Sequence, residues 1–260
     1  MMGKAREIIA LMESMRDEKQ REVLMRFFKT GEGEYGEGDE FLGLKVPQTR
    51  EVAKGSKGLK LEEVPELLTN RWHEVRLCGL LILVAKFEAL CKTKLLGNTE
   101  AGVERERILE MYLKYAEQAN NWDLVDLSAP KILGRWLMLP ANHPSTLSPE
   151  EDRSVKLQTA DSLAFSDNLW KQRMSMVCTW MTSREGDPSW CLRYAEIHLR
   201  HPHDLMHKAV GWMLREMGKN VSMNLLRDFL RQHIHEMPRT TLRYAIEKMD
   251  AGEKRYWMEY

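Results

Sequence analysis

The chain contains 260 residues, of which 43% are hydrophobic and 30% are charged, as in an ordinary soluble globular protein. This length is sufficient for one large domain or two small ones with a substantial core. Lys plus Arg equals Asp plus Glu at 39 each, which excludes a strong overall attraction to a polyanion and counts against nucleic acid as a partner.

The charges are unevenly distributed along the chain. Glu32–Glu40 holds five acidic residues and no basic one, whereas Lys45–Lys60 holds five basic residues and one acidic residue. A basic face is therefore possible on a protein without net charge. No signal peptide is recognisable, because Met1–Met15 is charged from Lys4 onward, and the longest apolar run, Leu80–Ala85, is too short to span a bilayer.

The four cysteines lie inside helical patterns and form no close CxxC pair; they are Cys78, Cys91, Cys178 and Cys191. We interpret them as reduced core thiols, which is typical of a cytoplasmic protein. We expect no membrane association and a monomer.

Hydrophobic residues recur with a period of about 3.6 nearly everywhere, and no run shows the alternation of a strand. Helices are predicted at Lys4–Ser14, Asp17–Lys29, Pro47–Lys54, Leu61–Leu68, His73–Ala89, Val103–Gln118, Trp122–Leu137, Pro149–Ala164, Asn168–Thr182, Pro188–Leu199, His203–Lys219, Ser222–His233 and Pro238–Met249. Several open on a cap or a first-turn proline, namely Asp17, Pro47, Asn121, Pro188 and Pro238. Breakers separate them at Gly31–Gly43, Gly97–Gly102 and Leu139–Glu151.

The predicted helices form pairs that recur along the chain. Arg76, Asp126, Arg173 and Trp212 occupy similar places in successive pairs, at spacings of 50, 47 and 39 residues. These spacings are close to the period of about 40–47 residues in HEAT-type repeats. We therefore predict an all-α fold, an α-solenoid of stacked antiparallel helix pairs with a concave face, as a single domain over residues 1–260. An irregular helical bundle is the alternative.

The segment "NNWDLVDLSAPKIL" places an acidic residue on an apolar stripe. Asp126 is in line with Trp122, whereas the packing stripe of this helix is predicted at Val125, Ile132 and Trp136. The Asp126 carboxylate would then face a groove. The alternative is a partly buried aspartate that is hydrogen-bonded to a neighbouring helix.

Two further helices place unusual residues on their faces. In "DNLWKQRMSMVCTW", Arg173 shares a stripe with apolar side chains, and a buried guanidinium requires an anion, either an internal carboxylate such as Asp126 or an external phosphate. In "MHKAVGWMLREMGK", Trp212 points away from the predicted core stripe of Met206, Val210, Met213 and Met217, and shares the charged face with Lys208. An exposed indole there is a candidate contact residue, although packing against the next repeat would also account for it.

Together, two indoles, a carboxylate and a guanidinium suit a cationic ligand attached to a phosphate backbone. The order and separation of "NNWDLVD", "SDNLWKQR" and "KAVGWMLRE" resemble the AlkD-like DNA alkylation repair glycosylases. This resemblance implies a HEAT-like fold that wraps duplex DNA on its concave side. It also implies excision of cationic N3- and N7-alkylated purines in base excision repair, without a metal or cofactor.

The resemblance assigns roles to particular residues. Asp126 would be the catalytic carboxylate that stabilises an oxocarbenium-like sugar, and Trp122 and Trp212 would contact the sugar or the cationic base. Arg173 would hold a backbone phosphate, and Lys208 is a further candidate for DNA binding. The acidic segment Glu32–Glu40 would repel DNA, so we expect it to lie off the binding face.

Two other functions stay open. A paralogue of the same fold could bind distorted or branched DNA without excising bases, and a HEAT-type scaffold could bind proteins while these residues serve internal contacts. A metal site is conceivable at His198, His201, His203 and His207, but these histidines straddle a helix break and lack a completing Cys or acid, so we expect no metal.

Overall fold

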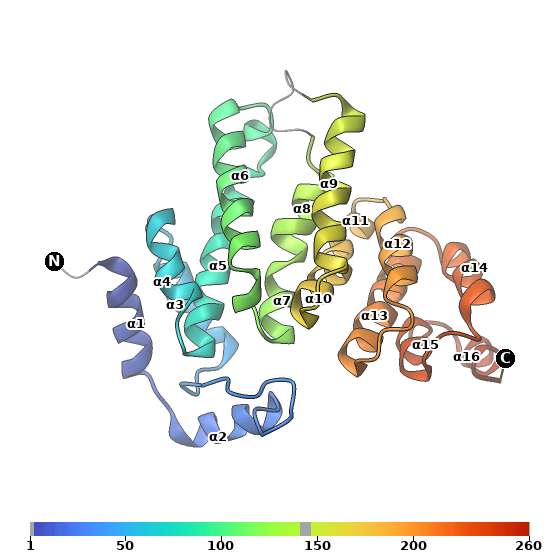
Figure 1. Ribbon diagram of the computed structural model, residues 1–260, viewed down its shortest axis with the longest axis horizontal. Coiled ribbons are helices and arrows are strands. Elements are labelled where there is room, and N and C mark those ends of the chain that lie inside the picture. Colours follow the sequence, from blue (N-terminus) through green and yellow to red (C-terminus); the bar gives the residue numbers. More distant parts are fainter. Residues whose placement is uncertain (1–2, 141–146, 260) are drawn as a thin grey trace. The chain divides into compact units, whose positions relative to one another are not determined.

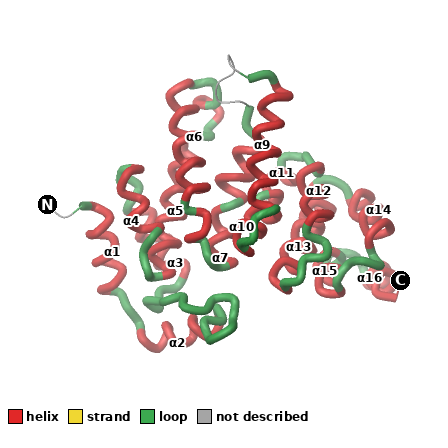
Figure 2. The backbone as a smooth tube through the Cα atoms, viewed as in Figure 1, coloured by secondary structure: helices red, strands yellow, loops and turns green. Residues whose placement is uncertain are grey.

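The computed structural model describes residues 3–140 and 147–259, and these form helices and loops without a strand (Figures 1 and 2). The all-α prediction is confirmed. The chain divides into two compact units, Met1–Ser128 (unit 1) and Ala129–Tyr260 (unit 2). That the chain forms a single domain stays a prediction. Residues 141–146 of the predicted break at Leu139–Glu151 lie outside the described residues.

Unit 1 contains seven α-helices and three short 3-10 helices in its described residues. They are α1 (Lys4–Ser14), α2 (Glu18–Phe27), α3 (Val46–Gly55), η1 (Leu61–Glu63), α4 (Val64–Leu68), α5 (His73–Leu90), η2 (Thr93–Leu95), α6 (Thr99–Lys114), η3 (Ala116–Gln118) and α7 (Trp122–Ser128). Local sequence sets several boundaries. The Asp17 carboxylate accepts a hydrogen bond from the Gln20 amide and caps α2, and Asn98 caps α6 in the same way through the Ala101 amide.

Helix α5 forms the centre of unit 1. It is mostly apolar and has no single polar face, and α3, α4, α6 and α7 pack against it. Gly79 permits the close approach of α4, because a Cβ atom there would lie 3.0 Å from both Leu67 Cβ and Leu68 Cδ2 of α4. The first turn of α5 nevertheless contains the polar residues His73, Glu74 and Arg76, and all three are buried. This turn therefore places charged side chains in the core of unit 1.

Unit 2 begins with a π-helical segment and continues with nine α-helices in its described residues. They are η4 (Pro130–Gly134), α8 (Arg135–Met138), α9 (Pro149–Ala164), α10 (Leu169–Val177), α11 (Thr179–Arg184), α12 (Ser189–Ile197), α13 (Asp204–Asn220), α14 (Met223–His233), α15 (Arg239–Ala245) and α16 (Ala251–Glu259). A capping box between Ser148 and Glu151 starts α9.

Helix α13 is the central helix of unit 2, and α10, α11, α12, α14 and α15 pack on it. Its predicted core stripe is confirmed, because Met206, Val210, Met213 and Met217 are all fully buried. Gly211 brings α15 into close contact, since a Cβ atom at this position would lie 2.4 Å from the Thr241 carbonyl oxygen.

Several predicted helices differ from the structure. The helix predicted at Trp122–Leu137 changes to π geometry at Pro130, which has no amide hydrogen to continue an α-helical ladder. The helix predicted at Asn168–Thr182 is interrupted at Cys178. Helix α6 begins four residues before its predicted start because Asn98 caps it, and α16 was not predicted.

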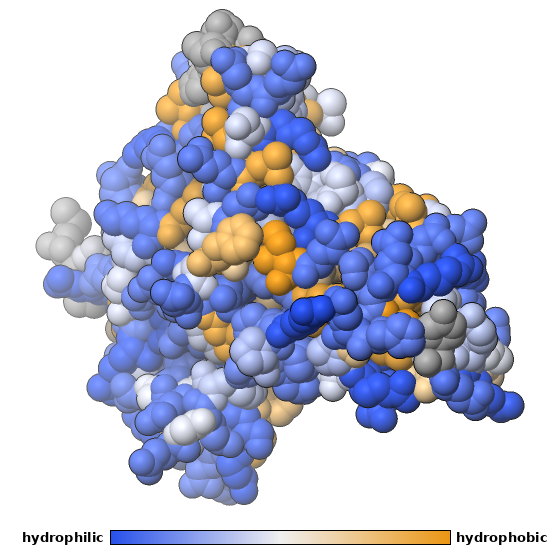
Figure 3. Space-filling model, turned by 45° about the vertical axis from the view of Figure 1, so that its right-hand side comes forward, coloured by the Kyte–Doolittle hydropathy of each residue, from blue (hydrophilic) through white to orange (hydrophobic). Residues whose placement is uncertain are grey.

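The surface is predominantly polar on the face drawn in Figure 3, with hydrophobic residues in small groups. All four cysteines are free thiols; Cys91 is half-buried and the others are buried, so three of the four predicted core positions are confirmed. Among residues 3–140 and 147–259, no helix combines the length and the apolar character needed to cross a bilayer.

Candidate functional site

Helix α7 leaves two side chains of the candidate site accessible in unit 1. Four of its seven residues are buried, whereas Trp122 and Asp126 are half-buried. These two residues are separated by one helical turn and therefore lie on the same side of α7. Asp126 is therefore not sealed inside unit 1.

Aromatic rings hold the Trp122 indole on one side. Phe28 stacks on Trp122 with ring centroids 5.3 Å apart and an interplanar angle of 27°. Phe27, the last residue of α2, meets the same indole edge-on at 5.9 Å and is itself 61% exposed. Neither phenylalanine stands out in the sequence as a partner of Trp122, because both lie nearly 100 positions before the motif that contains it.

A buried cluster of four charged residues lies behind Trp122. We name Asp39, His73, Arg76 and Asp123 the ion cluster. His73 Nδ1 donates to Asp39 Oδ2 at 2.7 Å, and Nε2 donates to Asp123 Oδ2 at 3.0 Å. The Arg76 guanidinium binds the other Asp39 oxygen at 2.5 Å. All four side chains are at most 7% exposed.

The charges of the ion cluster balance when His73 is protonated. Burial disfavours the imidazolium, but the charges and hydrogen bonds of Asp123 and Asp39 outweigh burial and raise the pKa of His73 to about 9. Burial likewise acts to raise the pKa of Asp39, but His73 and then Arg76 hold it below its ordinary value. Two cations and two anions therefore occupy the cluster at neutral pH.

Arg173 lies in unit 2 and contacts the first turn of α13. Its side chain is buried at 4% exposure, and its Nη1 donates to the Leu205 carbonyl oxygen at 2.6 Å. The guanidinium is therefore fixed in part by an internal acceptor. This acceptor is a backbone carbonyl oxygen, whereas the sequence predicted a carboxylate or an external phosphate.

Lys208 and Trp212 follow on α13, one helical turn apart and on the same side. Trp212 is half-buried. Lys208 is 41% exposed and forms an ion pair with Asp204 at 2.6 Å, and this pairing lowers the pKa of Asp204. The structure thus gathers Arg173 and Lys208 at the start of α13 and places Trp212 one turn beyond.

The four clustered histidines of unit 2 are engaged in hydrogen bonds. His198 Nε2 pairs with Ser175 Oγ at 2.8 Å, and His201 Nε2 pairs with the Gln172 side chain at 2.8 Å. His203 accepts from the Leu205 amide, and His207 Nε2 lies against the His201 carbonyl oxygen. Within the part of the chain that the structure describes, no group of three His, Cys, Asp or Glu residues is arranged to hold a metal ion.

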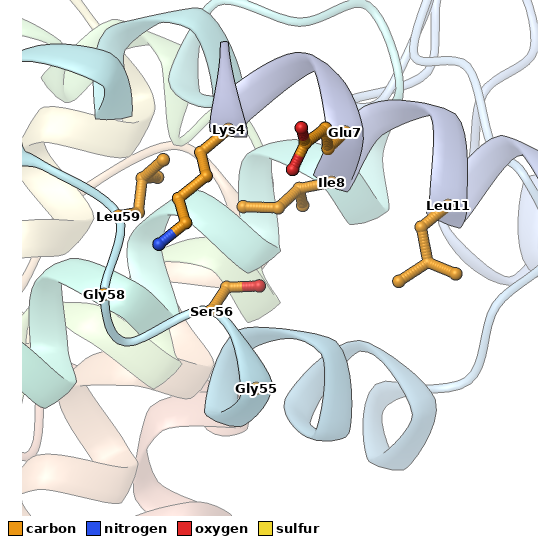
Figure 4. A pocket seen from close by; sticks show the side chains of 8 residues that line it. All are labelled: Lys4, Glu7, Ile8, Leu11, Gly55, Ser56, Gly58 and Leu59. Carbon is orange, nitrogen blue, oxygen red and sulfur yellow. The ribbon is translucent and has the colours of Figure 1, made fainter. Parts of the chain in front are cut away.

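A cavity of about 220 Å³ lies elsewhere in unit 1 (Figure 4). The Lys4, Ile8 and Leu11 side chains of α1 face the turn at Gly55–Leu59 across it. A Cβ atom at Gly58 would lie 3.3 Å from Lys4 Nζ, so the lysine covers this turn closely. The cavity contains none of the residues that the sequence motifs single out.

Comparison with known proteins identifies the family. A family model described as "DNA alkylation repair enzyme" matches residues 8–249. A search of curated proteins found no match. Among solved structures, a predicted DNA alkylation repair enzyme from Enterococcus faecalis superposes with a TM-score of 0.62 at 12% sequence identity, covering 91% of this chain and 97% of that one.

The structural likeness agrees with the helical pattern of the sequence and shows an all-α, solenoid-like fold, as predicted. The family match extends across the motifs that contain Trp122, Asp126, Arg173, Lys208 and Trp212, and it supports a role in DNA alkylation repair. The chain therefore belongs to the DNA alkylation repair enzyme family.

Proposed function

We propose that this chain is a DNA glycosylase that releases cationic N3- and N7-alkylated purines from duplex DNA. The observation that carries the proposal is the exposure pattern of α7. In a short helix whose other polar side chains, Asp123 and Ser128, are buried, an indole and a carboxylate stay accessible one turn apart. That pair supplies the two groups that the reaction requires.

The reaction breaks the C1′–N glycosidic bond, and the electron pair of that bond neutralises the cationic purine as it leaves. Positive charge then develops on the sugar, where a fixed carboxylate stabilises it electrostatically. Asp126 has this role in the proposal, and water completes the reaction by adding its oxygen to C1′ and losing a proton. The Trp122 face attracts the cationic base or sugar with about 0.5–2 kcal/mol.

The residues of unit 2 would bind the DNA strand in this proposal. Lys208 is exposed enough to meet a phosphate directly, in exchange for its present partner Asp204. Arg173 is more deeply buried and adds positive charge at the first turn of α13, where its hydrogen bond to Leu205 orients it. Trp212, one turn beyond Lys208, would lie against a sugar.

The test measures base release from duplex DNA containing 7-methylguanine. The purified full chain should release the base, and Asp126→Asn should reduce the single-turnover rate at least about 100-fold, as loss of a transition-state electrostatic contact does. Asp228→Asn is the matched control, because Asp228 is an exposed α14 residue whose ion pair with Arg231 lies outside the candidate site. Circular dichroism confirms that each variant is folded.

Each outcome selects one function. Release that depends on Asp126 supports the glycosylase. Tight binding of distorted or branched DNA without release would replace it with the non-catalytic paralogue, and absence of DNA binding would favour the protein scaffold. Release that survives Asp126→Asn unchanged would remove Asp126 from the mechanism.

A further inference from the structure

The ion cluster of unit 1 ties together three loops that are distant in the sequence. Arg76 donates to the carbonyl oxygens of Asn70 and Arg71 before α5, and to Gln118 O and Asn120 Oδ1 before α7. It also donates to Asp39 in the acidic segment Glu32–Glu40, which we name the acidic loop. An isolated β-bridge between Glu40 and Trp72 joins the acidic loop to the start of α5 as well. The cluster therefore fixes where α7 begins.

Trp122 lies next to the residues that make these contacts. Its successor Asp123 accepts the hydrogen bond of His73, and its predecessor Asn121 is fully buried. Behind its ring, Phe28 stacks on Phe41 with centroids 5.1 Å apart, and Phe41 stacks on the His73 imidazole at 4.4 Å. His73 thus contacts the side chain of Asp123, which follows Trp122 in the sequence, and the stacked rings of Phe41 and Phe28 that pack against the indole.

The acidic loop is part of this support. Gly36 lies so close to Phe28 and Asn121 that an added Cβ atom would be 2.4 Å from the Phe28 carbonyl oxygen and 3.3 Å from Asn121 Nδ2. Three residues away, Asp39 is buried in the ion cluster. The acidic segment Glu32–Glu40 is therefore docked at both places, and one of its five acids, Asp39, is buried.

We propose that His73, bridged between Asp39 and Asp123, is a positioning residue that sets the orientation of the Trp122 indole toward DNA. This inference rests on the proposed function for the purpose of the indole, but the orientation itself is a property of the free protein. The charged groups that face His73 are Asp39 from the acidic loop, Asp123 from α7 and Arg76 from its own helix. Glu74 is turned toward the backbone amides of Leu42, Gly43 and Leu44.

The orientation of the Trp122 indole should therefore depend on whether His73 is protonated. When His73 loses a proton, one of the two carboxylates loses its donor; Arg76 holds Asp39, whereas Asp123 Oδ1 already has no protein partner. The start of α7 should then shift, and Trp122 with it. Burial opposes protonation, but Asp123 and Asp39 prevail and keep the pKa of His73 at about 9, so the link should be seen at mildly alkaline pH.

The experiment uses ¹⁹F NMR of the full chain labelled with 5-fluorotryptophan. Trp122→Phe and Trp212→Phe identify two of the eight tryptophan signals. In the wild type, the Trp122 signal should shift with a midpoint near pH 9, and the Trp212 signal should show no such midpoint. His73→Gln should displace the Trp122 signal at neutral pH and abolish its titration, whereas His198→Gln, which removes a buried histidine of unit 2, should leave the Trp122 signal unchanged.

A second variant decides the matter if His73→Gln does not fold. Asp123→Asn removes one of the two anions that hold the proton, so the midpoint of the Trp122 signal should move to lower pH. A Trp122 signal that does not titrate in the wild type, or whose midpoint is the same in Asp123→Asn, would overturn the positioning role.

The activity arm separates this inference from the proposed function. If the wild type excises 7-methylguanine, His73→Gln should slow excision by about 100-fold, as misplacement by about 1 Å does, and should cause no further loss in a Trp122→Ala background. An equal loss in both backgrounds would overturn the positioning role. A wild type that does not excise would overturn the glycosylase alone, and the NMR titration would still decide the role of His73.

Discussion

The stability of unit 1 should depend on pH in a direction set by His73. Burial lowers the pKa of this histidine, but Asp123 and Asp39 outweigh it and raise the pKa from 6.5 to about 9. The folded state therefore holds the proton more tightly than the unfolded state. The resulting stabilisation is complete below pH 6.5 and disappears as the pH rises through about 9.

The magnitude follows from the difference between the two pKa values. Each pH unit between the folded and unfolded pKa corresponds to about 1.4 kcal/mol, so the range from 6.5 to about 9 gives roughly 3 kcal/mol. His73 is 2% exposed, so solvent screens this interaction little. The free energy of unfolding of the wild type should exceed that of His73→Gln by about 3 kcal/mol more at pH 6 than at pH 10.

Urea unfolding followed by the ¹⁹F signal of Trp122 measures this difference, because the signal reports unit 1. His198 in unit 2, followed by the ¹⁹F signal of Trp212, is the matched control with the opposite sign. Its burial lowers the pKa from 6.5 to about 4, so its contribution is present above pH 6.5 and is lost as the pH falls through about 4. An effect of His73→Gln that is equal at pH 6 and pH 10 would refute the argument that the folded ion cluster holds a proton.

Three further predictions concern unit 2. Gly211→Ala should destabilise it by roughly 1–3 kcal/mol in urea unfolding, because the new methyl group would overlap the Thr241 carbonyl oxygen; unchanged stability would show that α15 can move away. Asp204→Asn should strengthen duplex binding by about twofold to fivefold in fluorescence anisotropy, because it frees Lys208 from an exposed ion pair; weaker binding would contradict a phosphate role for Lys208. Arg173→Ala should weaken duplex binding and reduce the salt slope of affinity by about 1, whereas an unchanged slope would assign Arg173 to internal contacts alone.

The sequence predicted those parts of the fold that local signals determine. Lys4–Ser14 and Pro149–Ala164 match the structure in full. The first shows an apolar face, on which Ala5, Ile8 and Met12 are buried, and the second starts at the capping box of Ser148 and Glu151. Helix α16 was missed since its only buried residue is Trp257, which gives no periodic apolar face to recognise. The π-helical start of unit 2 was missed because Pro130 breaks an α-helical ladder without ending the apolar pattern.

The candidate site was predictable only in part, for a related reason. Trp122 and Asp126 stand out because both lie within one short motif, at a spacing that places them on the same face. The ion cluster joins Asp39, His73 and Asp123 from three segments, and each residue has an ordinary polar context in the sequence.

Stability alone does not account for a buried cluster of this kind. Removing four charges from water is costly, and well-packed apolar side chains of similar volume often give equal or greater stability. Apolar contacts are not directional, whereas hydrogen bonds are. Both ring nitrogens of His73 and all five N–H groups of Arg76 meet acceptors at particular positions before α5, in the acidic loop, and before and within α7. Such contacts specify one arrangement of the chain before α7. Since Trp122 is the first residue of that helix and is half-exposed, the accuracy gained there is transmitted to a side chain that solvent can reach.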